Sequence, residues 1–201
     1  SSYWEDVSSE NLNLEKLTKD INSEIVVIGG GYTGLLCGIN LMENYNLDII
    51  LVEAGKIGWG ASSRNAGFNC LPPSKMSFKK MQSIYGVEET KKFFKNSVEG
   101  SNHTKDIIKE YNIDCDVSGD SSYVVAHHKN KFEQIKEQAE VYKSEFDIET
   151  KIYSKEEFDE IGHQGTEQYG AFSYKPAFAI NPLKFVNGIA KHALSKKLKI
   201  F

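Results

Sequence analysis

Residues 24–68 read EIVVIGGGYTGLLCGINLMENYNLDIILVEAGKIGWGASSRNAGF. Two short apolar runs in this stretch, at 25–28 and 49–52, are typical of strands. The turn Gly29-Gly30-Gly31-Tyr32-Thr33-Gly34 follows the first run, and an amphipathic helical pattern separates this turn from the second run. Strand, glycine turn, helix and strand in this order predict an α/β fold with a Rossmann-like parallel sheet that binds a dinucleotide.

The glycine turn has a separate role for each of its glycines. Gly29 lets the strand turn sharply because it carries no Cβ atom. Gly31 lets the backbone approach a pyrophosphate closely, and Gly34 lets the helix pack tightly on the strands. Tyr32 and Thr33 begin the helix, whose N-terminal N–H groups and dipole favour negative charge. A glycine-rich turn in another kind of α/β domain is the alternative.

Glu53 ends the second apolar run, near the spacing of about 20 residues expected for an acid that binds ribose hydroxyls. A carboxylate at this point repels a 2′-phosphate. We therefore expect FAD or NAD as the ligand, rather than NADP.

The segment after Glu53 separates FAD from NAD. It reads AGKIGWGASSRNAGF from residue 54 to residue 68. Backbone N–H groups in such a glycine- and serine-rich segment, with one arginine, can bind phosphate oxygens. An NAD-binding unit does not need this second cradle, and a Gly/Ser surface loop is the alternative. The predicted FAD contacts in the segment are Ala54, Ser62, Ser63, Arg64, Asn65 and Gly67.

The run EAGKIGWGASSRNAGF resembles the second FAD motif of the D-amino acid oxidase superfamily of flavoproteins, whose usual form is close to EAGxIGxGASGRNGGF. Within it, the glycine/D-amino acid oxidases and gamma-glutamylputrescine oxidases are nearest by pattern. The chain departs from the motif at Ser63 and Ala66, where glycine is usual, and both replacements are small. The opening Ser2-Tyr3-Trp4 also resembles the N-terminal arm of the gamma-glutamylputrescine oxidase group.

This resemblance implies an FAD-dependent oxidoreductase that acts on the C–N bond of an amine or amino acid. Hydride would pass to flavin N5, the imine would hydrolyse, and oxygen or another acceptor would take the electrons. It places Arg64 and Asn65 near the pyrophosphate or the ring side of FAD and assigns no catalytic residue. Some relatives link FAD covalently through a histidine in the loop after the acid. The loop after Glu53 has no histidine, so we expect no such link in this chain.

The resemblance also orders the chain into an N-terminal arm at 1–20, the first part of the FAD-binding domain at 21–75, helical and substrate-sheet segments at 76–180, and a return to the FAD-binding domain at 181–201. We thus expect an inserted α+β substrate portion and an incomplete FAD sheet. Family members are longer, so the C-terminal half is expected to be missing and these residues alone to be poorly soluble and inactive. An NAD-dependent dehydrogenase and an inactive FAD-binding module are the alternatives.

Periodicity and capping signals outline the other elements. Helices are expected at 77–111, after the break at Pro72-Pro73, with possible interruptions at Gly86 and Gly100, and at 129–146 and 182–197. Strands are expected at 123–126 and 148–153, and a third parallel strand of the FAD sheet at 198–201. Ser154 starts a capping box before a short helix, and Asn181 caps a helix that has Pro182 at its first position.

Composition limits the classes of partner. The 201 residues carry a net charge of −4, which argues against nucleic acid and anionic membranes. No apolar run reaches the roughly 18 residues of a membrane span, and no signal-peptide pattern is present. Three cysteines without a CxxC motif indicate a reducing, cytoplasmic compartment, and Cys37 is assigned to packing. The five histidines form no metal-binding pattern, so no metal site is expected.

Overall fold

The computed structural model describes residues 2–8, 12–71, 76 and 78–201. The expected break at Pro72-Pro73 lies outside them. The chain divides into two compact units. Unit 1 comprises 1–68, 105–117 and 179–201, and unit 2 comprises 69–104 and 118–178. Residues 105–117 therefore belong to unit 1, although they lie within the 76–180 segment of the sequence.

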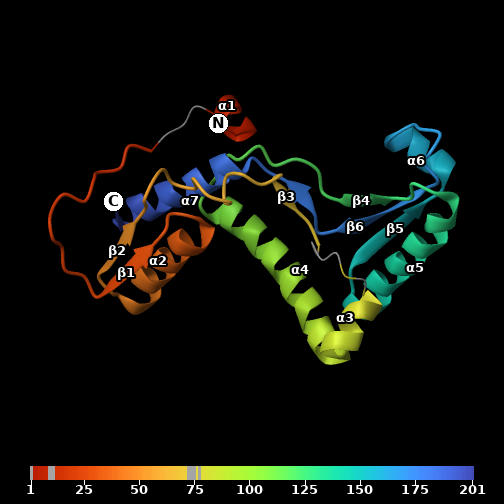
Figure 1. Cartoon of the computed structure of the whole chain (residues 1–201), viewed down its shortest axis with the longest axis horizontal. Helices are drawn as coiled ribbons and strands as arrows, with labels where there is room; N and C mark the ends of the chain where they lie inside the picture. Colours follow the sequence, from red (N-terminus) through yellow and green to blue (C-terminus); the bar gives the residue numbers. More distant parts are fainter. Residues whose placement is uncertain (1, 9–11, 72–75, 77) are drawn as a thin grey trace. The chain divides into compact units, whose positions relative to one another are not determined.

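Unit 1 contains a parallel sheet in the order β1-β2-β8 (Figure 1). Its strands are β1 (Ile25–Ile28), β2 (Ile49–Val52) and β8 (Lys199–Ile200), and β2 pairs with both neighbours. The two strands expected from the glycine motif and the third strand near the end of the chain are all confirmed. The mixed α/β class with a parallel sheet is likewise confirmed.

Two helices belong with this sheet, one packed on β1 and β2 and the other packed on that first helix. Helix α2 (Tyr32–Tyr45) follows the glycine turn, and helix α7 (Pro182–Ser195) precedes β8. The Asn181 side chain accepts hydrogen bonds from the N–H groups of Leu183 and Lys184, so the predicted cap is confirmed. Leu35, Ile39, Leu51, Ile189 and Leu198 are almost fully buried in this unit.

Two features of unit 1 differ from what the sequence suggests. Cys37 lies on α2 as expected but is exposed, so its assignment to packing is wrong. It follows the buried Leu35 by two positions, and in a helix this spacing turns a side chain away from the buried face. A short helix, α1 (Tyr3–Val7), lies in the arm, where the sequence shows no period.

Unit 2 is built on an antiparallel sheet in the order β4-β6-β5. It comprises β4 (Ser122–Val125), β6 (Ala171–Lys175) and β5 (Glu149–Tyr153). The outer strands, β4 and β5, are the two that the sequence predicts. The central strand β6 was not predicted, and two short strands, β3 (Phe68–Asn69) and β7 (Phe178–Ala179), pair separately.

The helices of unit 2 include α5 (Lys129–Phe146), which packs on the sheet at its predicted bounds, and α6 (Lys155–Ile161), which follows the predicted Ser154 capping box. The long helical pattern forms α3 (Phe78–Tyr85) and α4 (Val87–Glu110). The interruption expected at Gly86 is present, where φ is +81°. The one expected at Gly100 is absent, because a glycine inside a helix costs only about 0.5–1 kcal/mol relative to alanine.

Aromatic rings dominate the core of unit 2. Phe94 of α4 stacks on Phe146 of α5 with 4.0 Å between ring centroids. Tyr142 of α5 meets Phe172 and Tyr174 of β6 edge-on, at 5.9 and 5.6 Å. Edge-on aromatic pairs contribute about 0.5–1.5 kcal/mol beyond the area they bury. This core fixes the two helices against the sheet.

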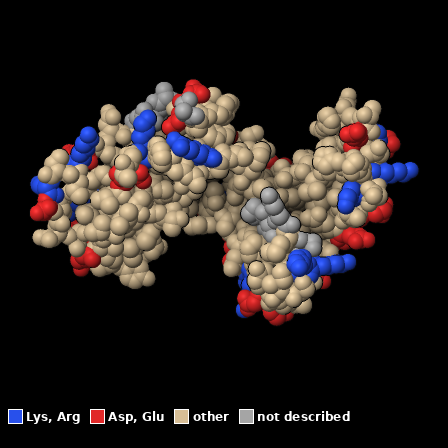
Figure 2. Space-filling model, in the orientation of Figure 1, with Lys and Arg blue, Asp and Glu red and all other residues tan. Residues whose placement is uncertain are grey.

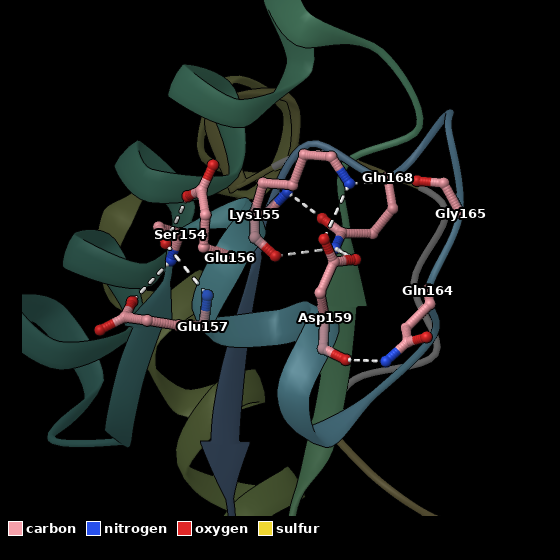
Figure 3. Close-up of polar contacts among 9 residues, drawn as sticks. Ser154, Lys155, Glu156, Glu157, Asp159, Gln164, Gly165 and Gln168 are labelled. Atoms are coloured by element: carbon pink, nitrogen blue, oxygen red, sulfur yellow. Dashed lines mark hydrogen bonds and ion pairs between the residues drawn. The ribbon is translucent and has the colours of Figure 1, made fainter.

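A polar network in unit 2 ties the chain after α6 to that helix (Figure 3). Its centre is Gln168, only 2% exposed, whose amide group donates to the Lys155 carbonyl at 3.1 Å and to an Asp159 oxygen at 3.0 Å. The Gln168 carbonyl oxygen accepts the Gly170 N–H. Lys155 Nζ also contacts Asp159, at 3.0 Å, and the Gly165 carbonyl, at 3.2 Å. Both the nitrogen and the oxygen of the buried Gln168 amide thus have hydrogen-bond partners.

Replacing Gln168 with alanine is expected to lower the free energy of unfolding of unit 2 by about 1–3 kcal/mol, because the buried Gly170 N–H loses its acceptor. Gln164 is a matched control, since it lies in the same loop, is exposed, and donates to the Asp159 carbonyl at 2.9 Å. Gln164→Ala should change stability by about 0.5 kcal/mol or less. Chemical denaturation followed by circular dichroism measures both, and equal effects would show that burial of Gln168 is immaterial.

Charged side chains of both signs are interspersed on the face drawn in Figure 2, with no large patch of one sign. Most ion pairs among the described residues are exposed, such as Lys92–Glu89 and Lys199–Asp48. Exposed pairs contribute little to stability. Within the described ranges, no helix has the length and apolar character needed to cross a membrane.

Candidate functional site

The turn after β1 brings helix α2 very close to the strand. Gly29 has φ of +105°, which favours glycine, and its N–H donates to the Val52 carbonyl of β2 at 2.8 Å. A Cβ atom on Gly34 would overlap the Gly29 carbonyl oxygen. Glycine at 34 is thus required for this close packing of α2 on β1.

Gly31 and Ser62 meet at the N-terminus of α2. Gly31 is the N-cap residue, and a Cβ atom on it would lie 2.8 Å from Ser62 Oγ. The Tyr32 N–H donates to that same oxygen at 3.2 Å. The first N–H groups of a helix have no acceptor within the helix, and the dipole makes this end positive. Glycine at position 31 therefore lets the Ser62 hydroxyl lie directly at the helix N-terminus, where anions are favoured.

Glu53 follows β2 and faces the same turn. One carboxylate oxygen accepts the Gly30 N–H at 2.7 Å, and the other accepts the Gly55 N–H at 2.8 Å. An ionised carboxylate has about four acceptor positions, so each oxygen keeps one for a hydroxyl group. Glu53 thus links the glycine turn to the segment after β2 and can still bind a ribose.

Glu53→Ala is expected to weaken FAD binding by one to two orders of magnitude, because a carboxylate hydrogen bond contributes about 1.5–3 kcal/mol. Glu53→Gln keeps one acceptor oxygen and should lose less affinity. Calorimetric titration with FAD measures both variants. An unchanged dissociation constant for Glu53→Ala would mean that Glu53 serves only to hold the two backbone N–H groups.

Hydrogen bonds from the Asn65 side chain hold the backbone of the segment from 54 to 67 in its turn. The Asn65 amide nitrogen donates to the Ala61 carbonyl at 3.0 Å and the Ser62 carbonyl at 3.2 Å, and its amide oxygen accepts the Gly67 N–H at 2.8 Å. Arg64 is exposed, and its guanidinium group lies 4.6 Å from the ring centroid of Trp59. This contact holds the cation beside the loop.

The remaining predicted contacts divide into exposed residues and residues that face the protein. Thr33 and Ala54 are exposed at the start of α2 and just after Glu53. Ser63 is only 3% exposed, and a Cβ atom on Gly67 would overlap the Ile180 carbonyl oxygen. Ser63 and Gly67 therefore pack against the protein and fix the conformation of the loop.

The side chain of Tyr32 also packs inward. Its hydroxyl group donates to the Pro182 carbonyl at 3.2 Å, and its ring lies 5.2 Å from that of Phe185. Burial raises the pKa of Tyr32 to about 12, so the phenol stays protonated near neutral pH. Only the backbone N–H of Tyr32 faces Ser62, and its side chain anchors α2 to α7.

A cavity of about 590 Å³ lies at the carboxyl ends of β2 and β8. Its lining includes Val52, Glu53 and Phe201, together with residues 12–17 of the arm. Ligands of open α/β sheets bind at this edge, and the volume suits a small molecule. The contribution of 12–17 was not predicted, because the arm carries no motif. Trp59 and the N–H groups of Gly30 and Gly55 were also missed, since their contacts depend on how the loop folds.

The chain is similar to a described protein family and to curated proteins. The DAO family, described as FAD dependent oxidoreductase, matches residues 24–201. Gamma-glutamylputrescine oxidoreductase of Escherichia coli strain K12 is 31% identical over 144 residues, which cover 71% of this chain and 33% of that protein. These findings confirm the resemblance inferred from the second FAD motif. The chain spans about a third of the length of this curated relative.

Solved structures share the fold at low sequence identity. L-amino acid deaminase from Proteus myxofaciens gives a TM-score of 0.71 at 18% identity, over 96% of this chain and 40% of that one. Glycine oxidase from Bacillus cereus gives 0.65 at 15% identity, over 90% and 46%. At such identities, the likeness establishes the fold alone.

Proposed function

The chain belongs to the DAO family of FAD dependent oxidoreductases, and from this membership we propose that it binds FAD and serves the oxidation of the C–N bond of an amine or amino acid. The NAD-dependent dehydrogenase, weighed earlier as an alternative, is disfavoured because the family is described as FAD dependent.

One observation carries the proposal. The Ser62 hydroxyl lies against the backbone at Gly31, at the N-terminus of α2, so closely that a Cβ atom on residue 31 would come within 2.8 Å of it. Glu53 lies at the carboxyl end of the adjacent strand with acceptor capacity to spare. An anion-binding helix end beside a hydroxyl-binding carboxylate suits the two parts of a dinucleotide, the pyrophosphate and the ribose.

The residues of this chain would bind and orient the cofactor. The N–H groups at the start of α2 and the Ser62 hydroxyl would hold the pyrophosphate, and Glu53 would accept ribose hydroxyls. Arg64 would supply positive charge to the phosphates from its position over Trp59. When bound, FAD supplies the acceptor for hydride, which no amino-acid side chain can provide.

The substrate class is supported by the names of the relatives. Gamma-glutamylputrescine oxidoreductase, L-amino acid deaminase and glycine oxidase are each named for a nitrogen compound in which an amine carbon can be oxidised. We propose a substrate of this kind, with oxygen or another acceptor to reoxidise the flavin.

Anaerobic reduction of the flavin tests the function. We expect primary or secondary amines, including amino acids, to bleach the flavin absorbance of the purified intact protein when oxygen is excluded. Admitting oxygen or an artificial acceptor should restore the absorbance. Bleaching by alcohols such as glycerol phosphate, with none by any amine, would contradict the substrate class without affecting the FAD assignment.

A further inference from the structure

Helix α1 is too short to be stable without outside support. It has five residues, and none of them is buried. Its capping box is complete, since Ser2 N–H donates to Glu5 Oε2 at 2.8 Å and Glu5 N–H donates to Ser2 Oγ at 3.4 Å. Isolated helices below about 12 residues are marginal in water even with good caps. Contacts with other parts of the chain must therefore hold α1 in place.

Helix α1 contacts α7, and a second contact comes from Trp4. Its indole N–H donates to the main-chain carbonyl of Asn65 at 2.8 Å, across 61 positions of sequence. A cavity of about 360 Å³ between the two segments is lined by Ser2, Tyr3, Trp4, Arg64 and Asn65. Helix α1 thus lies directly against the segment predicted to bind the phosphates of FAD.

Asn65 is the residue on which that segment folds. Its side chain donates to the carbonyl groups of Ala61 and Ser62 and accepts the Gly67 N–H. Its main-chain carbonyl accepts the Trp4 indole N–H. Ser62, in turn, accepts the Tyr32 N–H at the N-terminus of α2. A continuous series of hydrogen bonds thus runs from Trp4 to the position proposed for the pyrophosphate.

Charge adds a second tie between α1 and the loop. The hydrogen bond from the Ser2 backbone, followed by the positive charge of Arg64, lowers the pKa of the Glu5 carboxyl group. Glu5 therefore stays ionised near neutral pH, and its charge is opposite to that of Arg64. Solvent screens this attraction because Glu5 is only half-buried and Arg64 is exposed, so the Trp4 hydrogen bond is the more specific tie.

We infer that Trp4 is a positioning residue for the FAD site, holding the loop around Asn65 in the shape that receives the pyrophosphate. This inference rests on the proposed function, because it assumes that the loop binds FAD. Since the contact lies outside the packed core, its loss should affect the retention of FAD more than the stability of the FAD-free protein.

Trp4→Phe tests this role, because it keeps an aromatic ring and removes the indole N–H. One hydrogen bond corresponds to about threefold to tenfold in affinity, so we expect the FAD dissociation constant of the intact protein to rise by that factor, mainly through faster release. Tyr3→Phe is the matched control, since Tyr3 is 68% exposed on the same helix and its ring contact with Trp4 would remain. It should bind FAD like the wild type.

Three other results would overturn the inference. If Trp4→Phe and the wild type have equal FAD affinity and equal rates of FAD release, the Trp4–Asn65 hydrogen bond has no effect on FAD binding. A fall in the melting temperature of the FAD-free protein that accounts for the lost affinity would make Trp4 merely structural. Absence of FAD binding by the wild type would refute the proposed function itself, and the inference with it.

Discussion

Replacing Gly34 with alanine is expected to separate helix α2 from strand β1 and to abolish FAD binding. The added Cβ atom would overlap the Gly29 carbonyl oxygen, a backbone atom that cannot rotate away. Relief requires the helix to move off the strand, and Leu35 and Ile39 would then lose part of their burial. Overpacking of a well-packed contact costs about 1–3 kcal/mol, and we expect the upper end of this range here.

Denaturation detected by tryptophan fluorescence measures the loss of stability in unit 1, where Gly34 lies. The chain has two tryptophans, Trp4 and Trp59, and both lie in unit 1. Gly100→Ala is the matched control, because Gly100 also lies inside a helix, but a Cβ atom there would meet no other atom within 4 Å. The control should leave the fluorescence-detected unfolding of unit 1 unchanged, because Gly100 lies in unit 2. Unchanged unfolding and FAD binding in Gly34→Ala would refute the close packing.

Gly31→Val is expected to abolish FAD binding while leaving the fold intact. The Cβ atom would lie 2.8 Å from Ser62 Oγ, and the two methyl groups would fill the space proposed for the pyrophosphate. Unlike the Gly29 carbonyl, the Ser62 side chain can rotate, so the FAD-free protein should tolerate the change. We expect affinity to fall by more than about 100-fold, since both the space and the helix N–H groups become inaccessible.

Equilibrium titration with FAD and thermal unfolding together measure the Gly31→Val variant. Gly60→Val serves as its control, because Gly60 is not among the predicted FAD contacts and a Cβ atom there would meet nothing within 4 Å. This control should bind FAD normally. Stoichiometric flavin on purified Gly31→Val protein would show that the pyrophosphate does not approach Gly31.

The glycine motif was predictable from the sequence because its signals are local. Neighbouring residues alone carry them: the apolar runs mark the strands, the glycines mark the turn, and Glu53 marks the end of the second strand. The observed β1, α2 and β2 lie where these signals place them. The helix capped by Asn181 and the parallel strand β8 were predictable for the same reason.

Elements defined by distant contacts could not be predicted. Strand β6 is buried on both faces, so its residues do not alternate between polar and apolar in the way that marks an outer strand. Helix α1 is tied to the loop by the Trp4–Asn65 hydrogen bond across 61 positions, and no periodicity reports such a bond. The inward packing of Tyr32 likewise depends on α7, which lies far away in sequence.

Calorimetric titration of the purified, flavin-free intact protein with FAD and, separately, with NAD tests the central claim most directly. We predict saturable binding of one FAD per chain, loss of this binding in Gly31→Val, and no saturable binding of NAD. Absence of FAD binding by the folded wild type, or binding of NAD at equal affinity, would contradict the assignment of this site to FAD.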